Sequence, residues 1–125
     1  MPKTRKEKDS IGYIEIPSDA LYGAQTQRAI ENFQLGWPFD FNLILPYVII
    51  KKACAKANYA QKRISKNIAE AIIKSCDDIL EHPEKYLDQF PVTVFQTGSG
   101  TQTNMNLNEV IANKANLLLG GKDRK

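Results

Sequence analysis

An amphipathic pattern over residues 65–80 constrains the fold of this chain more than any other feature. Ser65 stands where a helix cap is expected, and His82-Pro83 follows as a stop signal. Between them, apolar residues recur with the α-helical period while charged residues fall on the opposite face. The apolar face consists of Ile68, Ala69, Ile72, Ile73, Cys76, Ile79 and Leu80. The sequence therefore predicts a helix that packs one side against a protein core.

A second helix is predicted over about residues 42–60. Asn42 is the expected cap, and Pro46 falls in the first turn, where its missing N–H is tolerated. The expected apolar stripe is Val48, Ile49, Ala53, Ala57 and Ala60, and the side expected to face away carries Lys51, Lys52, Lys56 and Lys62. Two helices joined by a short link are expected to pack as an antiparallel pair.

Shorter patterns complete a fold that is mainly α with a short extended or β element near the N-terminus. Residues 12–17 alternate and end in proline, which predicts a short edge strand. Residues 24–33 fit either a short helix or an extended loop, and residues 90–97 are typical of an extended stretch. A third helix is predicted from about residue 103 to 119, where Gly120-Gly121 stops it.

The formal net charge of +3 is concentrated at the two ends of the chain. Residues 1–8 carry four basic side chains against one acidic one, and residues 122–125 carry three against one. Residues 9–121 are left with ten basic and twelve acidic side chains. A phosphate-tracking surface needs its basic residues on the folded body, so we expect no nucleic-acid partner. Residues 1–8 are expected to form a flexible basic arm.

Metal and membrane proteins are also excluded as classes. His82 is the only histidine, and Cys54 and Cys76 match no metal-ligand spacing, so no metal site is predicted. Both cysteines are expected to be buried thiols of a reducing compartment. No apolar run is long enough to span a membrane, and no secretory segment opens the chain. We expect a cytoplasmic protein, with a mitochondrial location left open.

Residues 96–109 are the segment that indicates chemistry, and they read Gln-Thr-Gly-Ser-Gly-Thr-Gln-Thr-Asn-Met-Asn-Leu-Asn-Glu. Glycines allow the backbone to approach a ligand, and the first N–H groups of a helix favour an anion. Together with the hydroxyls of Ser99 and Thr101, they predict a corner that binds a carboxylate or a phosphate. The alternative is a flexible helix cap without a ligand, since Ser and Thr are common there. The spacing does not match a Walker loop.

Asparagines in the third predicted helix favour the ligand-binding alternative. Each one costs roughly 0.5–0.7 kcal/mol relative to alanine in a helix interior, and a buried amide without a partner costs about 1–3 kcal/mol more. Asn104 lies in the first turn of this helix, next to the glycine loop, so we expect it to contact a ligand. A structural polar network is the alternative for Asn106, Asn113 and Asn116.

Two segments closely resemble the fumarase/aspartase superfamily. Residues 98–106 and 108–113 are similar to its first shared region, and residues 23–28 (Gly-Ala-Gln-Thr-Gln-Arg) with Glu31-Asn32-Phe33 to its N-terminal segment. The resemblance extends over about residues 9–121, with the two motifs in the family's order. It favours class II fumarases, because aspartate ammonia-lyases carry a histidine at the position of Gln25 and a serine at that of Gln102.

The resemblance implies the N-terminal domain of the fumarase/aspartase fold, with residues 9–121 as an incomplete lyase domain and 122–125 as a truncated end. It implies that the substrate carboxylate is bound by Ser99, Gly100, Thr101 and Asn104, with Thr97, Gln102 and Arg28 as weaker candidates. Arg28 is expected either to pair with an internal carboxylate or to approach the site.

The activity implied is the reversible hydration of fumarate to L-malate in the tricarboxylic acid cycle, by a homotetramer without metal or organic cofactor. No catalytic residue is expected within this chain, because the family's catalytic histidine and serine loop would follow Lys125. The chain alone is therefore expected to be inactive. Two alternatives are a fragment of an aspartate ammonia-lyase and a stand-alone, non-catalytic binding remnant.

Overall fold

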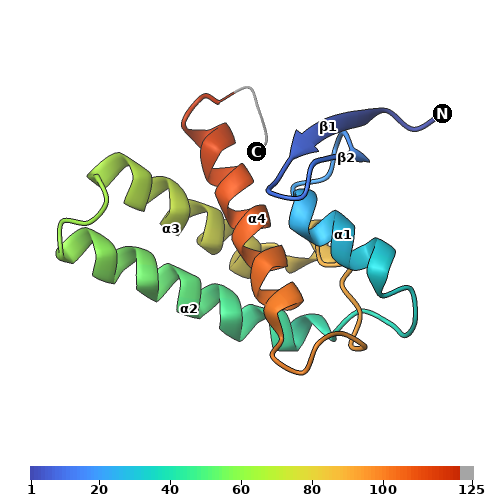
Figure 1. Cartoon of the computed structure of the whole chain (residues 1–125). Coiled ribbons are helices and arrows are strands. Elements are labelled where there is room, and N and C mark those ends of the chain that lie inside the picture. The colour runs from blue at the N-terminus through green and yellow to red at the C-terminus, as the bar shows by residue number, and fades with distance from the viewer. Residues whose placement is uncertain (122–125) are drawn as a thin grey trace.

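A helical hairpin organises the structure, a computed structural model that describes residues 1–121. Its arms are α2 (Phe41–Ala60) and α3 (Lys66–Glu81), which run antiparallel beside each other (Figure 1). Ser65 caps α3 by accepting a hydrogen bond from the Ile68 N–H at 3.4 Å, and His82 follows its last residue. The predicted helix pair is therefore confirmed.

The third predicted helix is α4 (Thr101–Leu118), which begins two residues earlier than expected. It packs on α3 and on α1 (Ala24–Asn32) (Figure 1). Two short 3-10 helices, η1 (Pro83–Lys85) and η2 (Leu87–Gln89), follow α3 along the chain. Val48, Ile79, Leu107 and Val110, from three of these helices, are fully buried. Burial of each such side chain contributes about 1.5–3 kcal/mol, so the core fixes α4 and with it the loop that precedes α4.

The strands β1 (Thr4–Lys8) and β2 (Tyr13–Pro17) form an antiparallel hairpin that lies beside α1 (Figure 1). Ile14 and Ile16 of β2 are buried while Tyr13 and Glu15 are exposed, as the alternation predicts. Residues 24–33 take the helical alternative, and residues 90–97 contribute only one isolated bridge, between Pro38 and Thr93. The prediction of a mainly α fold with a short β element is confirmed.

The structure replaces the predicted flexible arm over residues 1–8 with a strand over residues 4–8. The Arg5 guanidinium donates to the carbonyls of Pro17, Ala20 and Tyr22 at 2.8 Å each, and pairs with Glu7 at 2.7 Å. A guanidinium presents five donors in a fixed fork, so one side chain can gather several loop carbonyls. The side chains of Arg5 and Glu7, which were expected in solvent, therefore make contacts that hold the fold together. The predicted truncated end, residues 122–125, lies outside the described residues.

The buried face of α2 also differs from the prediction. Ile44, Val48 and Ala55 are buried, whereas the predicted stripe residues Ile49, Ala53, Ala57 and Ala60 are exposed. The first half of α2 is apolar on every side, so its period cannot select a face, and packing against α3 and α4 decides it. Because a different face of α2 is buried, Cys54 is exposed, although Cys76 of α3 is buried as expected.

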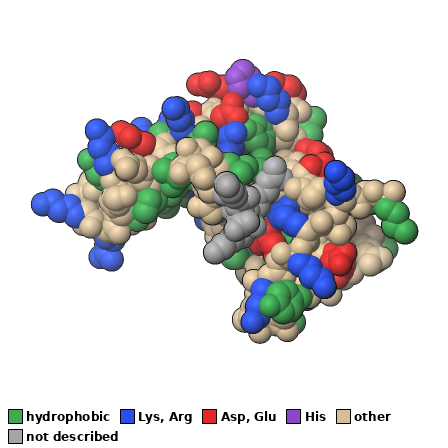
Figure 2. Space-filling view, turned by 90° about the horizontal axis from the view of Figure 1, so that it is seen from above, with side chains coloured by type: hydrophobic (Ala, Val, Ile, Leu, Met, Phe, Trp, Pro, Cys, Tyr) green, Lys and Arg blue, Asp and Glu red, His purple; other side chains and the backbone are tan. Residues whose placement is uncertain are grey.

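The N-terminal cap of α2 differs from the predicted one. The cap of α2 is Asp40, whose Oδ1 accepts from the Asn42 N–H at 2.8 Å, so the predicted cap is two residues too late. Acidic and basic side chains are interspersed over the face shown in Figure 2. No helix within residues 1–121 combines the length and the apolar character needed to cross a membrane.

Candidate functional site

The loop before α4 turns at Gly100, which has φ 72° and ψ 16°. Glycine adopts this left-handed conformation without steric cost. The Gly100 N–H donates to the Thr97 carbonyl at 3.0 Å, and its carbonyl accepts from the Asn104 N–H at 3.1 Å. The loop therefore closes directly onto the first turn of α4. A Cβ added at Gly98 or Gly100 would meet no described atom within 4 Å, so the backbone here is open to a ligand.

Three hydroxyl groups form a hydrogen-bonded chain on this loop. Thr97 Oγ1 donates to Gln102 Oε1 at 2.6 Å, and Ser99 Oγ lies 3.1 Å from Thr97 Oγ1 and 3.0 Å from Thr101 Oγ1. Each hydroxyl has a single proton, so the consistent direction of donation runs from Thr101 through Ser99 to Thr97. Thr97, Ser99 and Thr101 are exposed. The structure thus brings these four sequence-predicted residues together at the surface.

These hydroxyls do not cap α4, because the side chain of Gln96 accepts the hydrogen bond from the first turn of the helix. Gln96 Oε1 accepts from the Thr103 N–H at 3.1 Å, and Gln96 Nε2 donates to the Thr93 carbonyl at 2.9 Å. The N–H groups of Thr101 and Gln102 donate to no atom within residues 1–121. Unpaired N–H groups at a helix N-terminus carry partial positive charge and favour an anion. The corner therefore differs from a helix cap whose hydroxyls are already used.

The side chain of Asn104 is hydrogen-bonded to Lys51 of α2. Lys51 Nζ donates to Asn104 Oδ1 at 2.6 Å, and both side chains are partly buried. The expectation that Lys51 faces away is wrong, because packing against α3 and α4 selects a different face of α2 from the predicted one. Asn104 Nδ2 makes no hydrogen bond within the described residues. Nothing in the sequence distinguishes Lys51 from the other lysines of α2, so sequence reasoning missed it.

One cavity adjoins this corner, and a second lies beside Lys51. One, of about 170 Å³, is lined by Gly100 and Thr103 on one side and by side chains of α2 that include Tyr47 on the other. The second, of about 320 Å³, opens beside Lys51 and is lined mainly by apolar side chains, with Asn108 among its few polar groups. Concave surface therefore lies beside Gly100 and, separately, beside Lys51.

Two further asparagines of α4, Asn106 and Asn113, have structural partners. Asn106 Nδ2 donates to the Gln89 carbonyl at 2.8 Å, and Asn113 Nδ2 donates to the Leu21 carbonyl at 2.7 Å. Both side chains are buried, which agrees with the polar-network alternative for these two residues. Asn113 Oδ1 is the one buried side-chain polar atom without a hydrogen-bond partner among the described residues.

Arg28 lies on α1 and uses its guanidinium on the β-hairpin. Arg28 Nε and Nη2 donate to the Asp9 carboxylate at 2.7 and 2.9 Å, and Nη2 also donates to the Gly12 carbonyl at 3.1 Å. The Arg28 guanidinium, together with the N–H groups of Ile11 and Gly12, lowers the pKa of Asp9 to about 2. Of the two roles expected for Arg28, the structure shows the pairing with an internal carboxylate.

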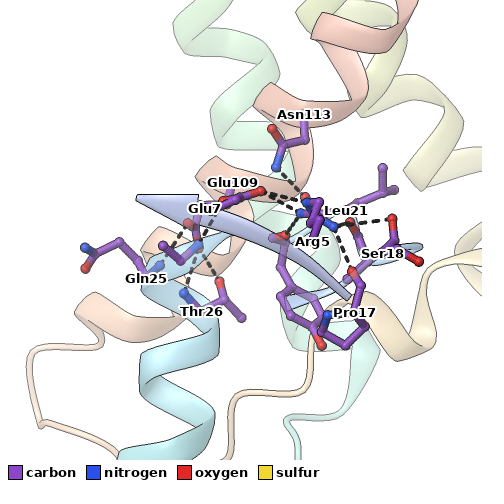
Figure 3. Close-up of polar contacts among 12 residues, drawn as sticks. Arg5, Glu7, Pro17, Ser18, Leu21, Gln25, Thr26, Glu109 and Asn113 are labelled. Carbon is purple, nitrogen blue, oxygen red and sulfur yellow. Dashed lines mark hydrogen bonds and ion pairs between the residues drawn. The ribbon is translucent and has the colours of Figure 1, made fainter. Parts of the chain in front are cut away.

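Two carboxylates anchor the N-terminus of α1, and one of them links it to α4 (Figure 3). Glu109 of α4 accepts from the Gln25 N–H at 3.0 Å, from the Thr26 N–H at 2.7 Å and from the Thr26 hydroxyl at 2.6 Å. Glu7 of β1 accepts from the Ala24 N–H at 3.2 Å. The helix that carries the hydroxyl corner is thus tied to the segment containing the other family-like motif. Sequence reasoning missed this role, because the two motifs are far apart along the chain.

No metal centre is formed within residues 1–121, where no three His, Cys, Asp or Glu side chains gather in a suitable arrangement. The arrangement at the loop can instead donate several hydrogen bonds to one small anion. The donors are the hydroxyls of Ser99 and Thr101, the free N–H groups of Thr101 and Gln102, and the Asn104 amide. A carboxylate accepts up to about four such bonds, so these five donor groups are enough for one carboxylate.

Comparison with known proteins gives consistent matches. A family model described as "Lyase" matches residues 12–123. The chain is 46% identical over 119 residues to the class II fumarate hydratase of Thermus thermophilus, covering 93% of this chain and 25% of that protein. It is 51% identical over 119 residues to the class II fumarate hydratase of Wigglesworthia glossinidia brevipalpis, covering 94% of this chain and 25% of that protein.

Solved structures agree with these matches. The crystal structure of the class II fumarase from Schistosoma mansoni superimposes with a TM-score of 0.91 at 35% identity, covering 98% of this chain and 26% of that chain. The chain therefore spans about a quarter of the length of the relatives it matches, in their N-terminal region.

Proposed function

The chain belongs to the lyase family whose model matches residues 12–123, and we propose that it supplies the N-terminal, carboxylate-binding part of a class II fumarate hydratase. The observation that carries this proposal is the open hydroxyl corner before α4. Its hydroxyls are exposed, they are not used to cap the helix, and unpaired backbone N–H groups lie beside them.

One carboxylate of fumarate or L-malate is bound at this corner. The hydroxyls of Ser99 and Thr101 turn from each other to the ligand, and the Asn104 NH₂ group donates a further hydrogen bond. Gly100 lets the backbone come close, while Thr97 and Gln102 hold the hydroxyl chain in place. Hydrogen bonds to a charged group contribute about 1.5–3 kcal/mol each, so this donor set suffices to orient a small dicarboxylate.

The reaction is the reversible addition of water across the double bond of fumarate. In the direction from malate to fumarate, a base removes a proton beside one carboxylate, and that group becomes an aci-carboxylate with two negative charges, which needs electrostatic stabilisation. The double bond then forms as the C–O bond breaks, and an acid protonates the departing hydroxide to give water. The donors at the corner serve the electrostatic stabilisation. We place no acid or base within residues 1–125, and we expect these residues alone to be inactive. The reaction as proposed needs neither a metal nor an organic cofactor.

The parent enzyme is proposed to be a cytoplasmic homotetramer of the tricarboxylic acid cycle. Apolar side chains exposed on α2, among them Leu43, Tyr47 and Ile50, support burial against further protein. Arg28 is assigned a structural role, because its guanidinium is already used by Asp9 and Gly12.

A hybrid enzyme tests the proposal. Residues 1–121 replace the aligned N-terminal region of the Thermus thermophilus hydratase, and the product is assayed with fumarate, L-malate and L-aspartate. A second hybrid with the Wigglesworthia segment controls for tolerance of the graft. We expect hydration of fumarate and no deamination of aspartate. Deamination by the first hybrid would favour the aspartate ammonia-lyase alternative. A folded first hybrid without hydratase activity, next to an active control hybrid, would contradict the proposal.

A further inference from the structure

Lys51 differs from every other partly buried basic side chain within residues 1–121. Arg5, Arg28, Lys52 and Lys114 each form an ion pair with a carboxylate, namely Glu7, Asp9, Asp77 and Asp78. Lys51 forms none among the described residues, and its one hydrogen bond goes to an amide oxygen. Even partial burial of an ammonium group without a counter-charge costs free energy, so a role other than internal pairing is indicated.

The contact with Lys51 fixes which end of the Asn104 amide is available. An ammonium group only donates hydrogen bonds, so the amide atom that faces Lys51 at 2.6 Å must be the oxygen. Oxygen and nitrogen lie at opposite ends of the amide, and the NH₂ group is therefore left for another acceptor. Asn104 Nδ2 has no such acceptor within the described residues.

From this geometry we propose that Lys51 is a positioning residue, which orients the Asn104 amide so that its NH₂ group meets the substrate carboxylate. This inference rests on the proposed function. Lys51 does not touch the substrate and takes no part in proton transfer. Without it the amide can flip and present its oxygen, which repels a carboxylate instead of binding it. The unpaired ammonium group also adds positive charge behind the amide, which favours an anion at the corner.

Kinetics of the hybrid hydratase test this role with three variants. Lys51→Met keeps the length and packing of the side chain but removes the donor, and we expect KM for fumarate to rise about tenfold with kcat changed less than about threefold. Lys51→Arg restores a donor and should return KM to within about threefold of the parent value. Lys52→Met is the matched control, because the neighbouring Lys52 pairs with Asp77 of α3 instead of Asn104. A KM unchanged by Lys51→Met overturns the inference.

NMR of the free 125-residue chain tests the orientation without any substrate. The order parameter of the Asn104 side-chain NH₂ group should fall in Lys51→Met and be kept in Lys51→Arg and Lys52→Met. An amide that stays equally ordered in Lys51→Met overturns the role of Lys51, whatever the hybrid does. Conversely, an inactive hybrid beside a loss of amide order would count against the proposed function and leave the orienting contact established.

Discussion

Single residues decide how acid affects this fold, and Asp9 is the clearest case. Its carboxylate accepts two hydrogen bonds from Arg28, and the N–H groups of Ile11 and Gly12 donate to it at 2.9 and 3.1 Å. The Arg28 contact, first among these causes, lowers the pKa of Asp9 from 3.8 to about 2. A carboxyl with a lower pKa in the folded state stabilises that state above its unfolded pKa, and this contribution is lost as pH falls toward 2.

We therefore predict that Asp9→Asn weakens the loss of stability between pH 4 and pH 2. Urea unfolding at several pH values in this window measures the effect, with Asp19→Asn, at an exposed carboxyl group, as the control. The prediction fails if the parent chain and Asp9→Asn lose stability in parallel over this range.

The candidate site shows which residues a sequence can reveal. Ser99, Gly100 and Thr101 stand in the glycine loop, and Asn104 stands in the asparagine-rich helix that follows it, so short local patterns were sufficient to select these candidates. Gln96, Lys51 and Glu109 act through contacts that only the folded chain creates. Lys51 and Glu109 reach across 53 and 83 residues, respectively, and no local pattern marks such a contact.

At the scale of elements, α3 was predictable because one face is apolar and the other charged. The first half of α2 is apolar on every side, so the sequence could not predict which face is buried, and packing against α3 and α4 decides it. The strand β1 escaped prediction for a different reason. Its charges looked solvated, yet Arg5 and Glu7 bind loop carbonyls and the N-terminus of α1.

The two cysteines test the observed orientation of α2 and α3. Cys54 is exposed on α2, while burial of Cys76 on α3 raises its pKa to about 11. Because the thiolate is the reactive form, we predict that one thiol of the folded chain reacts rapidly with a disulfide reagent and that both react in denaturant. Cys54→Ser should abolish the rapid reaction. Rapid labelling of Cys76 in that variant would show that α3 does not bury it.

Glu109 links α4 to α1, and its loss should weaken the whole fold. Glu109→Gln replaces one acceptor oxygen by a donor and leaves one of the two N–H groups of α1 that it binds without its partner. We predict a decrease of about 1–3 kcal/mol in the free energy of unfolding, measured by urea denaturation. Glu81→Gln, at an exposed position at the end of α3, should change it by less than about 0.5 kcal/mol. Equal effects of the two substitutions would argue against the anchor.

At the scale of the whole molecule, much apolar surface is left uncovered. Leu43, Tyr47, Ile49 and Ile50 of α2 are between 47% and 55% exposed. Several large apolar side chains exposed on one helix are typical of an interface. We predict that the 125-residue chain associates as its concentration rises, and that Ile49→Lys with Ile50→Lys reduces association without unfolding the helices. Sedimentation velocity and circular dichroism measure the two quantities. A parent chain that stays monomeric at high concentration would contradict this account.

The steady-state kinetics of Thr101→Ala in the hybrid hydratase test the proposed carboxylate-binding corner most directly. Removing one hydrogen bond to a charged ligand should lower kcat/KM for fumarate by about ten- to a hundredfold. Thr4→Ala removes the same hydroxyl from β1, where it contacts Glu15, and should leave the kinetics unchanged. If Thr101→Ala assembles normally and matches the parent in both kcat and KM, the corner before α4 does not bind the substrate.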